Sequence, residues 1–207
     1  MIIKKYTLGP VQANCYLLVC SNTKKAALID PGDRSTEIAE LISKEKYELS
    51  VIINTHGHFD HIGGNKFFSG GKVPVAAHRL EYERIKRGGD AAMFGLDCDI
   101  SPDPSIDASQ TDTISFGSVN LKVLHTPGHT QGHISLYHNE SASLFCGDVL
   151  FFRSIGRTDL PGGSQKQLLE SIRSKLYTLP GATVVYSGHG PETSIEDEIK
   201  HNPWTAQ

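Results

Sequence analysis

A dense group of metal-ligating side chains directly follows an apolar run in the first third of the chain. Residues 51–53 read Val-Ile-Ile, and His56, His58, Asp60 and His61 come soon after them. If the apolar run is a buried strand, the first two histidines leave its carboxyl end and can point to the same side, where they hold one ion. The aspartate and the third histidine then start the next turn and can reach a second ion nearby. The segment therefore predicts a strand that ends at a two-metal hydrolytic site.

Three residues further along the chain complete the candidate ligand set, namely His129, Asp148 and His189. Imidazole and carboxylate donors together suit zinc, iron or manganese. A single histidine is usually hydrogen-bonded or exposed, but three histidines and an aspartate within six positions are hard to explain as packing. The other histidines have no spacing that requires a metal, and we leave them out of the site: His78, His125, His133, His138 and His201.

Length, charge and the chain start limit the classes of protein and partner. A chain of 207 residues can bury a large core as one domain, and 21% of its residues are charged, with a net charge of -3. No broad basic field is present, so a nucleic-acid partner is not expected. The N-terminus lacks the apolar segment of a secretory signal, and no run approaches the length of a membrane span. We therefore expect a cytoplasmic protein with no membrane partner, while its oligomeric state is left open.

The cysteines and one basic run receive structural interpretations. Four cysteines form no C-x-x-C pair, so buried reduced thiols are expected. Cys146 lies two residues before Asp148 and is interpreted as strand packing rather than as a ligand. The basic run at residues 84–87 is interpreted as the solvent-facing side of a helix.

Short β-like runs alternate with amphipathic helices, which indicates an α/β layout. Strands are expected at residues 2–8, 15–20, 26–30, 49–54, 73–77, 119–125, 132–137, 143–146 and 184–187. Helices are expected at 35–44 and 79–87. Two capping boxes, Ser164-x-x-Gln167 and Thr193-x-x-Glu196, mark the starts of two more, the last of which ends at Asn202 before a proline. Residues 88–111 show no periodicity and are either a surface loop bordering the site or a disordered excursion.

The ligand pattern resembles that of the metallo-β-lactamase-fold hydrolase superfamily. Its H-x-H-x-D-H motif is matched at residues 56–61, and its three later ligands have candidates in the expected order. The resemblance implies a single-domain, four-layer αββα sandwich with all the ligands on loops at one sheet edge. It also implies a ligand assignment: His56, His58 and His129 on the first metal, Asp60, His61 and His189 on the second, and Asp148 bridging the two.

Within the superfamily the chain looks most like a short glyoxalase II-like thioester hydrolase. Supporting segments lie at residues 14–17, 29–32, 126–130 and 156–159. Asp148 argues against a true β-lactamase, because those enzymes as a family place Cys or Ser at that position. Full-length glyoxalase II continues into a helical domain that holds glutathione, whereas this sequence ends at Gln207. We therefore expect one hydrolase domain over residues 1–207 without that helical domain.

The chemistry implied by this resemblance is hydrolysis of a small thioester, with S-lactoylglutathione or a related hydroxyacyl-glutathione as substrate. Two divalent cations, zinc in first place with iron or manganese as alternatives, lower the pKa of a shared water from its bulk value towards about 7. Asp60 and Asp148 are the expected catalytic residues, and Asp60 can hold the attacking water as well as ligate. A thioester suits such a centre because a thiolate with a pKa of about 8 to 9 leaves without a strong general acid.

Residues around the ligands have two interpretations each. Asp30 can orient a ligating histidine or can serve simple turn chemistry. Arg157 can bind a substrate carboxylate or can pair with Asp159 and brace its loop. Tyr16 and Phe152 can line the mouth of the site, although aromatic residues at strand spacing are more often part of the core.

Three rival functions remain at this stage. Persulfide dioxygenases resemble the same superfamily and would use one iron on His56, His129 and Asp148. The complete second ligand set favours hydrolysis over that reaction. A lactonase would use nearly the same metal roles and would differ in pocket shape. A catalytically silent metal-binding module would lack a ligand, and none is missing.

Overall fold

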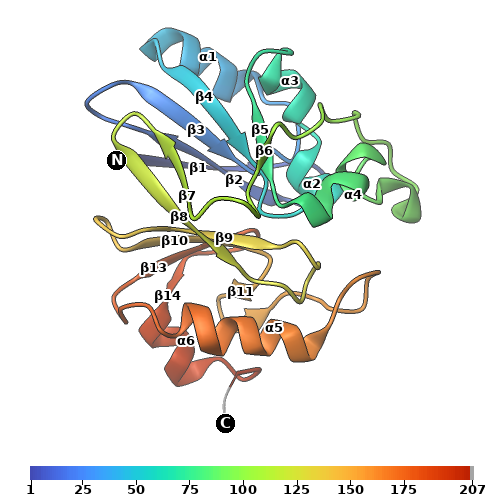
Figure 1. The fold of residues 1–207 in the computed structure, drawn as a ribbon, viewed down its shortest axis with the longest axis vertical. Coiled ribbons are helices and arrows are strands. Elements are labelled where there is room, and N and C mark those ends of the chain that lie inside the picture. Colours follow the sequence, from blue (N-terminus) through green and yellow to red (C-terminus); the bar gives the residue numbers. More distant parts are fainter. Residues whose placement is uncertain (206–207) are drawn as a thin grey trace.

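Two six-stranded sheets lie face to face at the centre of the molecule, and helices cover the outer face of each (Figure 1). These features come from a computed structural model that describes residues 1–205. The first sheet has the order β1-β2-β3-β4-β5-β6 and the second has the order β14-β13-β10-β9-β8-β7. The arrangement confirms the four-layer αββα sandwich.

The first sheet is built by the first half of the chain. Its strands are β1 (Ile2–Leu8), β2 (Ala13–Val19), β3 (Lys25–Ile29), β4 (Glu48–Ile53), β5 (Val75–Ala77) and β6 (Ile106–Asp107). The helices of this half are α1 (Thr36–Glu45), α2 (Phe59–Ile62), α3 (Asn65–Ser69) and α4 (Tyr82–Lys86), with short turns η1 (Arg79–Glu81) and η2 (Ala91–Phe94). Helices α1 and α3 lie on the outer face of the sheet (Figure 1).

The second sheet is built by the second half of the chain. Its strands are β7 (Thr113–Phe116), β8 (Val119–His125), β9 (Ile134–His138), β10 (Ser143–Gly147), β13 (Val184–Ser187) and β14 (Thr193–Ser194). A small hairpin, β11 (Leu150–Phe151) and β12 (Ser154–Ile155), follows β10. Helices α5 (Gln165–Ser171), η3 (Ile172–Leu176) and α6 (Ile195–His201) belong to this half, and α5 and α6 cover the outer face of the sheet (Figure 1).

The apolar core lies in three layers, which explains why the central strands read as continuous apolar runs. Ile29 and Ile53 of the first sheet pack between the sheets with Phe145 of the second. On the outer side, Ile38 of α1 packs against the opposite face of the first sheet. Leu168 of α5 does the same for the second sheet. Strands buried on both faces have no solvent-facing side, so apolar and polar residues do not alternate along them.

Most expected elements are confirmed, with ends that shift by one or two residues, and the differences have local causes. The expected helix at 79–87 is a 3-10 turn followed by α4. Strand β7 was not predicted, because four residues of alternating exposure give a weak signal. Residues 88–111 form a surface segment with one 3-10 turn and the edge strand β6, rather than a disordered excursion.

The predicted N-cap at Ser164 is confirmed, although its own N–H donates to the carbonyl of Gly128 and not to Gln167, and the second predicted cap is wrong by one residue. The Ser164 hydroxyl accepts a hydrogen bond from the backbone N–H of Gln167, as predicted. At α6, the capping residue is Ser194 and not Thr193. Thr193 is paired with β13 in the sheet and its hydroxyl donates to the carboxylate of Glu198, so it is not available as a cap.

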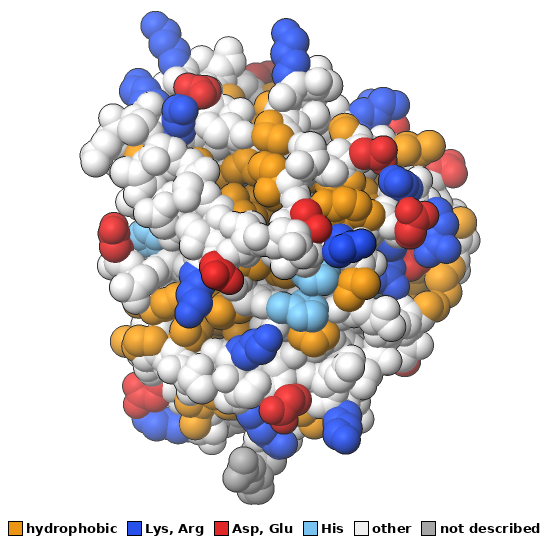
Figure 2. Space-filling view, viewed as in Figure 1, with side chains coloured by type: hydrophobic (Ala, Val, Ile, Leu, Met, Phe, Trp, Pro, Cys, Tyr) orange, Lys and Arg blue, Asp and Glu red, His pale blue; other side chains and the backbone are white. Residues whose placement is uncertain are grey.

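Charges of both signs are interspersed on the face drawn in Figure 2, with apolar side chains between them. Within residues 1–205, no helix has the length and apolar character needed to cross a membrane. The expected absence of a nucleic-acid partner stays a prediction.

The sheet topology determines where the polar loops gather. Strands β3 and β4 run parallel in the first sheet, and β10 and β13 run parallel in the second. The carboxyl ends of parallel neighbours lie at the same sheet edge. Asp30, His56, Asp148 and His189 each follow one of these four strands.

Candidate metal centre

Loops at one edge of the sandwich bring all seven candidate ligands together. The loop after β4 carries His56 and His58, and α2 carries Asp60 and His61. His129 lies in the connection between β8 and β9. A glycine permits close approach of two of these loops, since a Cβ on Gly188 would lie 2.1 Å from Oδ1 of Asp148. The close packing of these loops therefore depends on a residue without a side chain.

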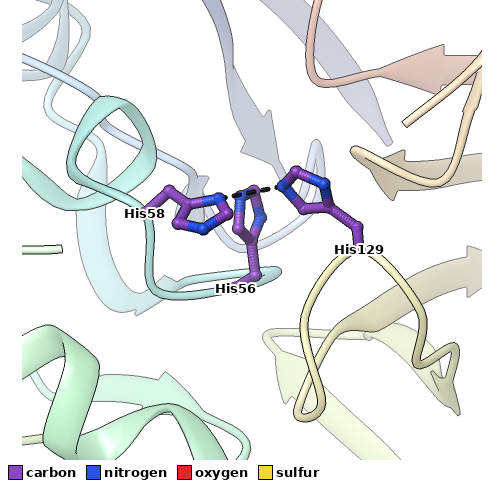
Figure 3. Close-up of side chains that lie close together, drawn as sticks. All are labelled: His56, His58 and His129. Atoms are coloured by element: carbon purple, nitrogen blue, oxygen red, sulfur yellow. Dashed lines mark hydrogen bonds between the residues drawn. The ribbon is translucent and has the colours of Figure 1, made fainter. Parts of the chain in front are cut away.

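Three imidazoles form the first triad, which Figure 3 shows converging from two loops. Donor atoms of His56, His58 and His129 all lie within 4.8 Å of one another. The Nδ1 atom of His58 is 2.9 Å from Nε2 of His129. Two imidazole nitrogens at this distance can share a cation between them.

A carboxylate and two imidazoles form the second triad, and Asp148 lies between the triads. Donor atoms of Asp60, His61 and His189 also fall within 4.8 Å of one another. Oδ1 of Asp148 is 3.5 Å from Nε2 of His61, and its Oδ2 is 3.6 Å from Nε2 of His129. One carboxylate thus faces both groups, which is the geometry that a bridging ligand requires.

Unpaired buried atoms show that these residues fit a cation. Nε2 of His56, His58 and His61 and Oδ1 of Asp148 have no hydrogen-bond partner, although they are buried. An unsatisfied buried polar atom costs about 1–3 kcal/mol. A divalent cation would satisfy several of these atoms at once. The cluster is therefore suited to hold metal ions in two adjacent positions.

Asp30 fixes the orientation of two of the histidines. Its Oδ2 accepts hydrogen bonds from Nδ1 of His61 at 3.0 Å and from the Thr55 hydroxyl at 2.7 Å. Because that hydroxyl donates its proton to the carboxylate, it must accept from Nδ1 of His56, 3.0 Å away. Both rings thereby turn Nε2 away from these partners, which is the orientation that a metal ligand requires. These contacts agree with the interpretation of Asp30 as a residue that orients a ligating histidine.

Two further contacts orient ligands, and one involves a histidine that the sequence did not identify. Nδ1 of His129 donates to the carbonyl of Arg157 at 2.7 Å, which leaves its Nε2 for a cation. His133 is fully buried, its ring stacks on that of His56, and its Nε2 accepts from the backbone N–H of Asp148 at 3.1 Å. Its only signal in the sequence is its position at the start of an expected strand.

A buried carboxylate ties two ligand loops together. Glu81 accepts hydrogen bonds from the backbone N–H of Gly57 at 3.0 Å and of Gly132 at 2.7 Å. Arg84 donates to the same carboxylate at 2.9 Å and to Asp90 at 2.8 Å. The interpretation of Arg84 as solvent-facing is therefore wrong, because its side chain is only 11% exposed and pairs with Glu81 and Asp90. Nothing in the spacing of charges distinguished Glu81 from an exposed helical glutamate.

Electrostatics differ between the two triads in the absence of a cation. Burial lowers the pKa of His56 well below its ordinary value and lowers that of His58 to about 2. Burial alone would also lower the pKa of His61, but the carboxylates of Asp60 and Asp148 outweigh it and raise that pKa to about 10. His56 and His58 thus offer neutral imidazoles, whereas His61 of the second triad is an imidazolium beside the two carboxylates.

The remaining candidate residues have structural partners. The guanidinium of Arg157 makes two hydrogen bonds to Asp159, at 2.7 and 2.8 Å, and this pairing agrees with a role in bracing its loop. Tyr16 is buried in the core between the sheets, and Phe152 is exposed away from the cleft beside the ligands. The thiol of Cys146 is buried in the layer below the second sheet and lies 3.1 Å from the carbonyl of Leu150.

Comparison with known proteins agrees with this fold and site. Residues 8–189 match the metallo-beta-lactamase superfamily, and the chain belongs to that superfamily. It is 34% identical to hydroxyacylglutathione hydrolase GloC from Haemophilus influenzae, over 93% of this chain and 92% of that protein. The family and the His/Asp cluster together define a metallo-hydrolase.

Two solved structures are similar over nearly their whole length. The B3 metallo-beta-lactamase BLEG-1 has a TM-score of 0.94 and 36% identity, covering 100% of both chains. The structure of TTHA1623 in a di-iron-bound form has a TM-score of 0.87 and 35% identity, covering 97% of this chain and 99% of that one. The predicted superfamily and fold are confirmed.

Proposed function

We propose that this protein hydrolyses a small thioester with a hydroxide held by two divalent cations, and that a hydroxyacyl-glutathione such as S-lactoylglutathione is a substrate. The observation that carries the proposal is the pair of ligand triads joined by Asp148. The name of the Haemophilus relative supports the substrate class. The di-iron form of the similar structure supports a two-metal site, with zinc, iron or manganese as the cation.

The seven candidate ligands would hold the two ions as the resemblance implies, and the ions would supply a hydroxide nucleophile and a Lewis acid for the carbonyl oxygen. Asp60 would orient the attacking water; in support, it lines the cleft and its Oδ2 lies 3.2 Å from Nε2 of His189. Asp30 keeps two imidazoles in the correct tautomer through its hydrogen bonds. The thiolate product leaves unprotonated, so no separate acid is needed.

β-Lactam hydrolysis is the second candidate, supported by the likeness to BLEG-1. Both reactions begin with attack on a carbonyl and differ in the leaving group. An amine leaves far less readily than a thiolate and needs a proton donor. Among residues 1–205, the cleft lining includes no Lys or Tyr side chain to act as one, which ranks this reaction second.

A substrate panel tests the proposal. Protein reconstituted with zinc, iron or manganese is assayed with S-lactoylglutathione, a chromogenic cephalosporin and a simple lactone, and oxygen uptake is followed with glutathione persulfide. We expect thioester cleavage to have the highest kcat/KM and to proceed without oxygen. Oxygen uptake by the iron form with negligible thioester cleavage would reassign the protein to the dioxygenases. A higher kcat/KM for the lactone or for the cephalosporin would reassign the protein to the lactonases or to the β-lactamases.

A further inference from the structure

The cleft beside the candidate metal centre has a largely apolar lining. It has a volume of about 430 Å³, and its floor contains five of the candidate ligands. Apart from these, its walls are formed mostly by Val11, Phe59, Phe94, Leu96, Phe151 and Leu160. Val11 and Phe94 remain 44% and 45% exposed, so the apolar surface faces solvent. Exposed apolar surface gathered around one cleft indicates a binding surface for an apolar group.

Both halves of the sandwich contribute to these walls. Val11 comes from the turn between β1 and β2, and Phe94 and Leu96 come from the surface segment that follows α4. Phe94 packs on Phe59 with ring centroids 5.6 Å apart. Phe151 comes from the β11–β12 hairpin of the second half. An apolar group beside the metal centre would therefore be enclosed by rings and aliphatic side chains from separate loops.

In the part of the chain that the structure describes, the cleft lacks free cationic side chains that could bind a negatively charged thiol carrier. Arg157 is the one Lys or Arg side chain lining the cleft within residues 1–205, and it is already paired with Asp159. Glutathione carries two carboxylates, which are recognised most strongly by free guanidinium or ammonium groups. The lining therefore complements an uncharged substituent better than a charged peptide.

We propose that the preferred substrates are thioesters with an apolar substituent next to the scissile bond, carried by the acyl group or by the thiol. This inference rests on the proposed thioester hydrolysis and specifies its substrate class. The substituent would lie against Phe94, Leu96 and Phe151 while the carbonyl is at the metal centre.

Two series of thioesters test the proposal with metal-loaded protein. In the first, the acyl chain is lengthened from acetyl through butanoyl to hexanoyl on N-acetylcysteamine. In the second, acetyl thioesters of alkane thiols of increasing length are compared. Each buried methylene contributes about 0.8 kcal/mol, so we expect kcat/KM to rise up to about fourfold per methylene in at least one series. A flat response in both series, or a faster reaction with lactoylglutathione than with every apolar thioester, would overturn the proposal.

A matched pair of variants tests whether the cleft is responsible. Leu96→Asn places a polar group in the wall, and Leu80→Asn makes the same change at an exposed leucine outside the cleft. We expect Leu96→Asn to reduce the hexanoyl-to-acetyl ratio of kcat/KM severalfold and Leu80→Asn to leave it unchanged. Equal ratios in the two variants would place the apolar site elsewhere and contradict the assignment.

A binding measurement tests the apolar cleft independently of the proposed reaction. S-methyl and S-hexyl thioethers of N-acetylcysteamine contain no scissile thioester, so their affinity for the metal-loaded protein is measurable by calorimetry even if no thioester is cleaved. Tighter binding of the hexyl compound, lost in Leu96→Asn, would support the apolar cleft independently of catalysis. Equal affinities would refute it, whereas failure of every thioester assay would refute only the reaction.

Discussion

Substituting Glu81 by glutamine removes a charge from a buried position without changing its volume. Oε1 of Glu81 accepts from the N–H of Gly132, whereas Oε2 accepts from the N–H of Gly57 and from Arg84. A glutamine has one amide oxygen, so its NH₂ group must face a backbone donor on one side. The substitution therefore loses at least one hydrogen bond to a charged group and weakens the pairing with Arg84.

The lost hydrogen bond sets the expected change in the free energy of unfolding. A hydrogen bond to a charged group contributes about 1.5–3 kcal/mol, so we expect Glu81→Gln to lower the free energy of unfolding by about that amount. Urea unfolding at fixed metal concentration measures it. Glu83→Gln is the matched control, because Glu83 lies two residues further along the chain in α4 and its side chain is 82% exposed. A change within about 0.5 kcal/mol is expected there.

The same substitution tests the link between Glu81 and the metal centre. Gly57 separates two candidate ligands, and Gly132 lies in the β8–β9 connection that carries His129, so loosening either loop displaces ligand atoms. Loss of a residue that supports metal ligands typically weakens metal affinity by about 10–100-fold. Competition with a chelator measures that affinity in both variants. Equal stability and equal affinity in Glu81→Gln and Glu83→Gln would refute the argument that Glu81 clamps the two loops.

Three other substitutions test separate parts of the account. Asp30→Asn keeps a residue that tolerates the positive φ of 49° but weakens acceptance from His61, and we expect metal affinity to fall by about 10–100-fold in a chelator competition. Asp148→Asn should remove most bound metal and activity together, as read by elemental analysis and thioester turnover, and full activity in that variant would sink the two-metal scheme. Gly128→Ala would place a Cβ 2.3 Å from the backbone of Leu168, so we expect a loss of several kcal/mol, on the order of 3, in urea unfolding, and a loss below about 1 kcal/mol would show that the two segments can separate freely.

Local sequence signals predicted the candidate ligand cluster and most of the strands. His56 and His58 directly follow a continuous apolar run, and such a run is informative because both faces of β4 are covered. Residue type and position were sufficient for these residues because the chemistry itself requires imidazole and carboxylate groups. The site could therefore be predicted wherever a ligand follows a recognisable strand.

Residues that act through long-range contacts could not be predicted in this way. Glu81 contacts loops that are 24 and 51 residues away along the chain, and no local pattern encodes those distances. His133 has the same residue type as the ligands but hydrogen-bonds to a backbone N–H instead of facing the centre. The shift of the α6 cap from Thr193 to Ser194 also has a tertiary cause, since pairing with β13 occupies the first of the two residues.

A metal titration of thioester hydrolysis tests the central claim most directly. Metal-free protein receives increasing equivalents of zinc, iron or manganese, and S-lactoylglutathione and hexanoyl-N-acetylcysteamine turnover is measured at each step. The two-triad site with its bridging Asp148 leads us to expect negligible turnover without metal and a rise that levels off at two equivalents per chain. Full turnover at one equivalent, or turnover that does not depend on added metal, would contradict hydrolysis at a two-metal centre.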